Sequence, residues 1–176
     1  MSAAGERPRG TLTVPPPLGL RPATDDDLPF LLRLYGSLRA EELAGADWPA
    51  EQKEAFVRQQ FEAQHAWYHE SYTGASFDVV EVDGLPAGRL YVARWPSEVR
   101  IVDISLLPEH RGGGLGGALL QAVFADADAG GKPVSIHVER FNPALRLYSR
   151  LGFALREDKG VYLLLQRPVG GAAAAD

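Results

Sequence analysis

A run of glycines between a strand pattern and a helical pattern constrains this chain more than any other feature. Residues 100–107 are rich in β-branched residues and leucine and end at Pro108. After residues 112–117, GGGLGG, apolar residues recur at helical spacing. Glycine lets the backbone turn with nothing projecting, and a helix start directs N–H groups and the positive end of its dipole at one small volume. This arrangement predicts a pyrophosphate-binding turn.

The glycine-rich turn alone is compatible with more than one protein class. Gly112, Gly114 and Gly117 also satisfy G-x-G-x-x-G, and Glu139 follows the next strand as a ribose-binding acid does in a Rossmann fold. That fold continues with further strand–helix units, whereas residues 140–176 hold only one short helical pattern. The architecture therefore argues against a dinucleotide-dependent oxidoreductase, while a turn without any ligand stays open at this point.

Periodicity along the chain predicts a mixed α/β or α+β fold. The expected order is strand, two helices, three strands, helix, strand, helix and two strands. Asp83-Gly84 predicts a hairpin turn, and Thr24 followed by three aspartates predicts a helix start. The expected strands are residues 18–21, 77–82, 87–95, 100–107, 133–139, 153–155 and 161–166; the expected helices start near Thr24, Pro49, Leu115 and Asn142.

Length and composition exclude several classes of protein. The 176 residues fit one domain, which we expect at residues 17–168 between a disordered arm, 1–16, and a flexible tail, 169–176. A net charge of −5 argues against nucleic-acid binding. The absence of cysteine excludes thiolate metal sites and a cysteine nucleophile. Without a signal peptide or membrane-length apolar run, we expect a cytoplasmic protein with no membrane partner, and a homodimer is left open.

Two linked motifs resemble those of the GNAT superfamily of N-acetyltransferases. Residues 111–116, RGGGLG, match the signature R/Q-x-x-G-x-G/A. Residues 142–153, NPALRLYSRLGF, are similar to the second motif of that family, N-x-x-A-x-x-L-Y-x-x-x-G-F. The one departure is that Asn142 precedes Ala144 by two residues instead of three. The resemblance is clear over residues 77–168.

The resemblance implies a GNAT-like, mostly antiparallel mixed sheet of six or seven strands with about four helices. Its central strands would splay to admit coenzyme A, with acetyl-CoA as co-substrate, an amine as acceptor and no metal. The residues that it assigns to cofactor binding are Ile104, Ser105, Leu106, Arg111, Gly112, Gly113, Gly114, Leu115, Gly116, Gly117 and Asn142.

Tyr148 is the predicted general acid. Acetyl transfer expels a thiolate whose conjugate acid resembles cysteine, with a pKa of about 8.5, against about 10 for tyrosine. A tyrosine hydroxyl beside the sulfur therefore stabilises and finally protonates the leaving group. The alternative is a core tyrosine on the apolar stripe of its helix.

The general base is left open between several polar residues. Asp103 interrupts an apolar strand, which is costly unless the carboxylate has a partner, and His137 has a suitable intrinsic pKa. Glu139 shares the face of His137, Glu81 is a further candidate, and similar enzymes often relay the proton through water. A structural role is an equal alternative for each residue.

The acceptor has no sequence motif, so small amines, antibiotics, peptide N-termini and protein lysines stay open. The aromatic residues Trp48, Trp67, Tyr68, Tyr72 and Trp95 line an acceptor pocket or belong to the core. His65 and His69 have metal-ligand spacing, but no third ligand is evident and we expect no metal. The competing function is a non-catalytic acyl-CoA-binding or regulatory module on the same fold.

Overall fold

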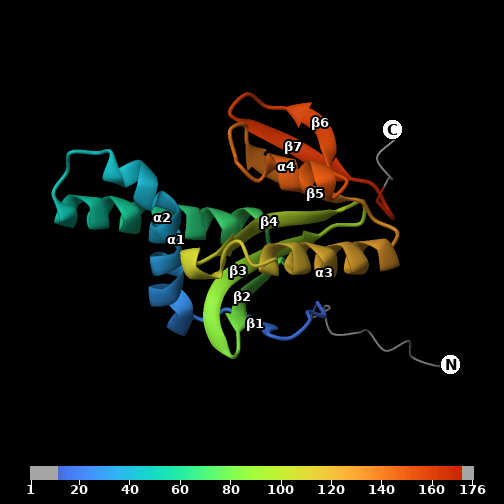
Figure 1. The fold of residues 1–176 in the computed structure, drawn as a ribbon, viewed down its shortest axis with the longest axis horizontal. Coiled ribbons are helices and arrows are strands. Elements are labelled where there is room, and N and C mark those ends of the chain that lie inside the picture. Colours follow the sequence, from blue (N-terminus) through green and yellow to red (C-terminus); the bar gives the residue numbers. More distant parts are fainter. Residues whose placement is uncertain (1–11, 172–176) are drawn as a thin grey trace.

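The computed structural model describes residues 12–171, which form seven strands, four α-helices and two 3-10 turns (Figure 1). This order of strands and α-helices is the predicted one. The elements are β1 (Leu18–Pro22), η1 (Asp25–Asp27), α1 (Leu28–Ala44), α2 (Ala50–Ser71), β2 (Ser76–Val82), β3 (Leu85–Arg94), β4 (Val99–Leu106), η2 (Pro108–His110), α3 (Leu115–Ala129), β5 (Val134–Glu139), α4 (Leu145–Arg150), β6 (Ala154–Asp158) and β7 (Tyr162–Arg167).

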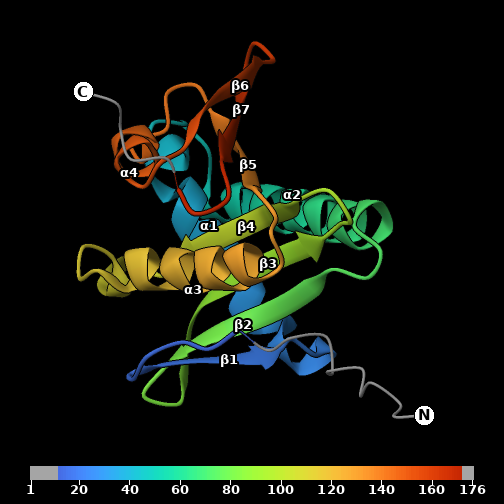
Figure 2. The same ribbon diagram turned by 90° about the vertical axis from the view of Figure 1, so that its right-hand side faces the viewer.

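The seven strands form one sheet in the order β1-β2-β3-β4-β5-β7-β6. Neighbouring strands are antiparallel except β4 and β5, which are parallel because α3 carries the chain across between them. Helix α3 covers one face of the sheet, and α1 and α2 lie on the other (Figure 2). The predicted mixed, mostly antiparallel sheet is therefore confirmed.

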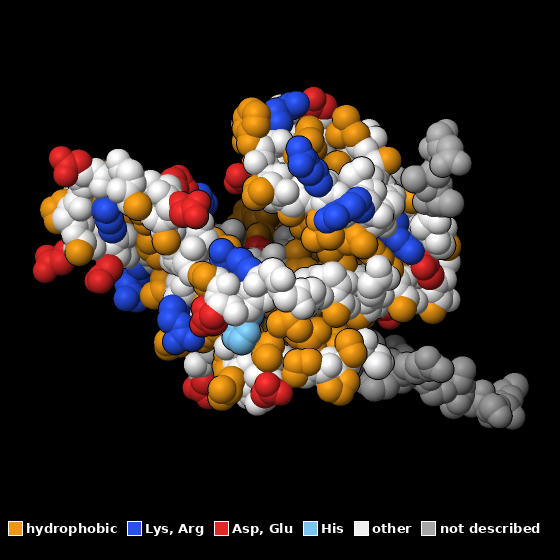
Figure 3. Space-filling model, in the orientation of Figure 1, with side chains coloured by type: hydrophobic (Ala, Val, Ile, Leu, Met, Phe, Trp, Pro, Cys, Tyr) orange, Lys and Arg blue, Asp and Glu red, His pale blue; other side chains and the backbone are white. Residues whose placement is uncertain are grey.

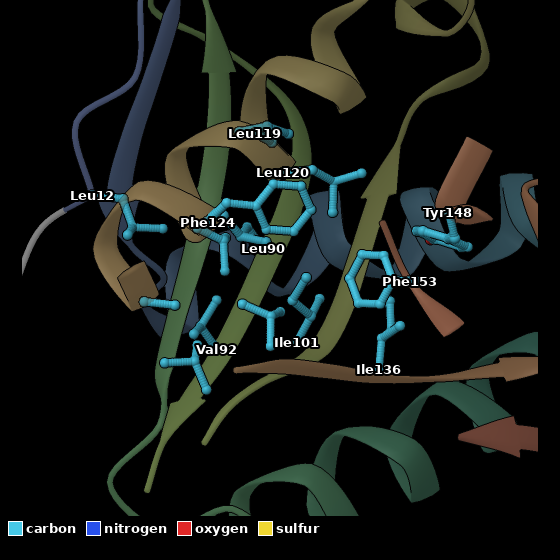
Figure 4. Close-up of a cluster of buried hydrophobic side chains, with 14 of the residues drawn as sticks. Leu12, Leu90, Val92, Ile101, Leu119, Leu120, Phe124, Ile136, Tyr148 and Phe153 are labelled. Atoms are coloured by element: carbon cyan, nitrogen blue, oxygen red, sulfur yellow. The ribbon is translucent and has the colours of Figure 1, made fainter. Parts of the chain in front are cut away.

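The main hydrophobic core lies between α3 and the sheet (Figure 4). Leu119, Leu120 and Phe124 of α3 pack there with Leu90 of β3 and Ile101 of β4, all at most 2% exposed. Full burial of such side chains contributes about 1.5–3 kcal/mol each. A second cluster lies on the opposite face, with Leu31, Leu34, Phe61 and Val79 among its members. Packing on both faces makes the central strands a rigid support for a site.

Two local signals act as predicted. Thr24 and Asp27 form a capping box, in which the N–H of Thr24 donates to Asp27 Oδ2 at 2.8 Å. The helix start differs in detail, because a 3-10 turn precedes α1. Asp83 and Gly84 both have positive φ, 51° and 80°, as a tight turn between paired strands requires, and they join β2 to β3.

The ends of the packed chain differ from the expected domain boundaries. Residues 1–11 and 172–176 of the predicted arm and tail lie outside the described residues. Leu12 is only 7% exposed and belongs to the main core, so packing begins before residue 17. At the other end, the N–H of Gly170 donates to Asp128 Oδ1 at 2.8 Å, which ties the start of the tail to α3. Apolar burial and a backbone hydrogen bond thus extend the packed unit at both ends.

Candidate active site

The central strands β4 and β5 separate halfway along their length. They pair only where residues 99–101 face residues 134–136. At the separation point Val92 pairs with Ile101 and Tyr91 with Asp103, so Val102 is the extra residue of a β-bulge. A bulge bends its strand and interrupts the ladder, which explains why β4 leaves β5 here. The predicted splay of the central strands is confirmed.

A cavity of about 520 Å³ opens where the strands separate. Figure 3 shows the molecule hollowed between α3 and the lobe of α4, β6 and β7. Residues 102–105 of β4 line one wall and residues 136–139 of β5 line the other. The cavity brings together six of the predicted site residues: Asp103, Ile104, Ser105, His137, Asn142 and Tyr148.

The glycine-rich turn begins where β4 ends and leads into α3. Gly112 and Gly114 have φ of 77° and 83°, a left-handed conformation that favours glycine. The left-handed conformation is not required at Gly113, Gly116 or Gly117. A Cβ atom at any of these three positions would meet nothing within 4 Å. Glycine within a helix costs about 1 kcal/mol relative to alanine. Packing within the protein therefore does not explain these glycines, whereas close approach of a ligand to the backbone does.

Arg111 fixes the turn to the end of β4. Its Nε donates to the carbonyl oxygen of Leu106 at 2.9 Å, and the N–H of Leu107 donates to the carbonyl of Ala87 on β3 at 2.8 Å. Beyond the turn, the first residues of α3 leave their N–H groups without helical partners. These donors and the helix dipole suit an anion such as a pyrophosphate.

Helix α4 places Tyr148 on the cavity. The helix expected to start near Asn142 begins at Leu145, and Asn142 Oδ1 accepts the N–H of Ala144 at 2.8 Å just before it. Tyr148 is 7% exposed, and its ring meets Phe153 edge-on with centroids 5.6 Å apart. The structure thus combines a core position with access to the cavity.

The Tyr148 hydroxyl is chemically available. It has no hydrogen-bond partner among residues 12–171. Burial, and next the negative charge of Asp103, raise the pKa of Tyr148. The hydroxyl therefore keeps its proton at neutral pH and can donate it to a group in the cavity.

Asp103 has the partners that an ionised side chain in an apolar strand needs. Its Oδ2 accepts hydrogen bonds from Tyr68 Oη and Arg89 Nη2, both at 2.8 Å, and its Oδ1 accepts one from Ser105 Oγ at 2.6 Å. Arg89 is 1% exposed, and its Nη2 also donates to Gln64 Oε1 at 2.8 Å. Asp103 is thus the counter-ion of a buried arginine and joins β4 to β3 and α2.

His137 faces the same cavity, but one of its nitrogens is occupied. Arg100 Nη1 lies 3.2 Å from His137 Nδ1, and an arginine can only donate, so Nδ1 accepts and the proton of the neutral ring lies on Nε2. Burial, and next the charge of Arg100, lower the pKa of His137. The neutral imidazole consequently offers a hydrogen-bond donor toward the cavity.

Of the other two candidate bases, only Glu139 shares the cavity. Glu139 lines the cavity at the end of β5, whereas Glu81 pairs with Arg21 Nε at 3.3 Å between β2 and β1.

His69 stacks on Phe77 with centroids 4.0 Å apart. Within residues 12–171, no group of three His, Asp or Glu side chains is arranged to hold a metal ion. No helix in that part of the chain is long and apolar enough to cross a membrane.

Sequence reasoning missed Arg89 and Gln64, and it named Tyr68 only as a pocket or core aromatic residue and not as a partner of Asp103. The unpaired Asp103 was the available signal, because a buried carboxylate implies a buried donor. Arg89 interrupts the apolar run of β3 in the same way that Asp103 interrupts β4. Two opposite charges in adjacent apolar strands are a recognisable pattern, but the α2 partners depend on tertiary packing.

The chain is similar in structure to solved acetyltransferases. The PaiA N-acetyltransferase of Thermoplasma acidophilum, solved with coenzyme A, has a TM-score of 0.65 at 18% identity, over 86% of this chain and 98% of that one. An acetyltransferase of Thermus thermophilus has a TM-score of 0.62 at 24% identity, over 86% and 96%. The ribosomal L7/L12 alpha-N-protein acetyltransferase RimL has a TM-score of 0.64 at 21% identity, over 93% and 99%. These TM-scores establish a shared fold.

The sequence comparison identifies the family of the chain as well as its fold. No curated protein matches the chain, but residues 38–153 match the model of the acetyltransferase (GNAT) family. The split strands, the glycine-rich turn and Tyr148 beside the gap are compatible with an acyl-CoA-dependent transferase. The match covers most of the chain, so this protein belongs to the GNAT acetyltransferase family and uses acetyl-CoA.

Proposed function

We propose that this protein transfers the acetyl group of acetyl-CoA directly to a primary amine. The observation that carries the proposal is the Tyr148 hydroxyl, which has no partner among the described residues and lines the gap between β4 and β5. Among residues 12–171, the buried side-chain atoms without a partner are Arg89 Nε and Tyr91 Oη, so the Tyr148 hydroxyl is open to the cavity instead of being enclosed in the core. A protonated hydroxyl that opens onto a cleft is suited to a general acid.

The residues around the gap fit coenzyme A. The unpaired edges of Ile104 to Leu106 and of residues 137–139 offer backbone groups to an extended chain such as the pantetheine arm. The turn at residues 112–117 offers N–H groups and space to the pyrophosphate. Arg146 and Arg150 of α4 are exposed, and Figure 3 shows basic side chains over α4 beside the hollow. This charge complements an anionic cofactor.

The chain's own residues supply the acid–base chemistry. When bound, acetyl-CoA supplies an activated thioester, whose C–S bond breaks as the amine nitrogen forms the new C–N bond. Tyr148 Oη gives its proton to the departing thiolate. Because the chain has no cysteine to carry an acetyl group, transfer takes place in a ternary complex.

Asp103 and His137 stay the proposed bases, and their contacts favour action through water. Asp103 already accepts three hydrogen bonds, and Nδ1 of His137 accepts one from Arg100. Asp103 therefore keeps about one of its four acceptor sites, on Oδ1, and the remaining ring nitrogen of His137 carries a proton. A water molecule in the cleft, ordered by these side chains, would accept the proton of the amine and pass it to solvent.

Gly116→Glu tests cofactor binding. Gly116 has ordinary helical φ and open space around it, so the new side chain is tolerated by the fold but places bulk and negative charge in the proposed phosphate site. Acetyl-CoA at a hundredfold excess over Kd stabilises the wild type by about 2.7 kcal/mol, measured by thermal unfolding. We expect Gly116→Glu to lose this stabilisation and the matched control Gly116→Ala to retain most of it. Wild type that is folded but not stabilised by acetyl-CoA would contradict the proposed function.

A further inference from the structure

A second hollow, of about 450 Å³, lies between α2 and the strands β4, β5 and β7. It is on the α2 side of the sheet, opposite to α3, and α2 lies beside β4 in both ribbon views (Figures 1 and 2). Its walls are formed by Trp67, Tyr68, Tyr72 and Tyr162, and Ile101 and Val102 contribute apolar surface. We call this the aromatic hollow.

The aromatic hollow adjoins the cleft of the split strands and shares part of its lining. Five residues line both the hollow and the cleft: Gln64, Tyr68, Val102, His137 and Tyr162. Tyr68 connects the two chemically, because its ring borders the hollow while its hydroxyl donates to Asp103. A molecule in the hollow therefore lies next to the cleft in which the thioester carbonyl of the cofactor would lie.

Ring contacts hold this surface in a fixed shape. Trp67 meets Tyr72 edge-on, with centroids 5.7 Å apart and an interplanar angle of 85°. Tyr72 in turn stacks on Trp95 at 6.1 Å. Trp67 and Tyr162 nevertheless remain 54% and 49% exposed. Rigid aromatic rings left open around a hollow are typical of a ligand site and offer flat surfaces to a planar group.

Charge in the hollow selects among amines. Lys159 is the only charged residue among its described lining residues, and its Nζ lies 4.0 Å from the exposed carboxylate of Glu157 outside the hollow. His137 stays neutral, because burial lowers its pKa, and its Nε2 carries a proton to donate. Carboxylates line only the adjoining cleft, at Glu42, Asp103 and Glu139, whereas a carboxylate bound in the hollow would find an ammonium group and an N–H donor.

We propose that the acceptor is a primary amine with a planar aromatic body and a carboxylate or similar anionic group. The aromatic body occupies the aromatic hollow, the anion lies near Lys159, and the amino group reaches the cleft. This inference rests on the proposed acetyl transfer. The products are the N-acetyl amide and free coenzyme A, with one proton released from the ammonium group.

A set of matched amines tests the substrate class. We would measure coenzyme A release with para-(aminomethyl)benzoate, benzylamine, aminomethylcyclohexanecarboxylate and spermidine. We expect kcat/KM to be highest for the first, with a loss of about tenfold or more on removing either the carboxylate or the planar ring. A higher kcat/KM for spermidine or for the cyclohexane analogue would overturn the inference.

Variants locate the binding site. Trp67→Ala should raise KM for para-(aminomethyl)benzoate about tenfold or more, with a smaller effect on kcat, because an exposed aromatic contact is lost. The matched control is Trp48→Ala, since Trp48 packs on Phe56 away from the hollow. Lys159→Gln should raise that KM more than the KM for benzylamine, and Lys132→Gln should change neither. Equal effects of Lys159→Gln on both amines would refute the anion site.

The two proposals fail in different ways. If acetyl-CoA stabilises the protein and another class of amine is acetylated, the acceptor assignment is wrong and the acetyltransferase proposal stands. If acetyl-CoA neither binds nor is consumed with any amine, the proposed function itself is wrong.

Discussion

Replacing Asp103 with asparagine tests whether this carboxylate is mainly the counter-ion of Arg89. The substitution keeps the shape and one acceptor oxygen, so the contacts from Tyr68 and Arg89 survive, but the negative charge is lost. Removing one partner of a buried ion pair costs about 3–5 kcal/mol. Because Gln64 also accepts from Arg89 Nη2, we expect the lower end, about 3 kcal/mol. For a chain of this size that loss lowers Tm by about 6–12 °C.

Urea unfolding and thermal melts of Asp103→Asn measure this loss directly. The matched control is Asp78→Asn, because burial raises the pKa of Asp78 and a neutral amide there should cost little. The double variant Arg89→Met, Asp103→Leu should recover much of the stability, since an apolar pair needs no charge balance. A loss below about 1 kcal/mol for Asp103→Asn, together with a large fall in kcat, would refute the counter-ion role and favour a direct base.

Two further predictions concern Tyr148 as the general acid and the stability of the fold at low pH. Tyr148→Phe should reduce kcat by about 10²- to 10⁴-fold, because the proton donor is lost. KM, Tm and acetyl-CoA binding should change little. If the variant turns over at the wild-type rate, the thiolate leaves without help from Tyr148. Hydrogen bonds from Arg21, and next from the backbone N–H of Thr24, hold the pKa of Asp27 below its usual value of 3.8, despite burial. Asp27 therefore stabilises the fold above that pH and loses this contribution as the pH falls through its lowered pKa. In Asp27→Asn the free energy of unfolding should be about 1 kcal/mol lower at neutral pH and should fall less steeply as the pH is lowered. The same pH dependence in the variant and the wild type at low pH would contradict this role.

Local sequence determined the elements and the glycine-rich turn of this protein. The capping box at Thr24, the Asp83-Gly84 hairpin and the glycines of residues 112–117 act through neighbours a few residues apart. Their conformational preferences are therefore readable without the fold. The family resemblance added the splayed strands and the position of Tyr148, because its motifs imply a known arrangement.

Tertiary structure decided the electrostatics of the site and the shape of the aromatic hollow. The partners of Asp103 come from Tyr68 and Arg89, 35 and 14 residues away along the chain, and Arg100 meets His137 across 37 residues. No local pattern encodes such pairs, since they depend on the bulge at Val102 and on how α2 packs against the sheet. The sequence alone therefore predicts a cofactor-binding acetyltransferase, whereas the fold decides which polar groups are occupied and which surface is left for the acceptor.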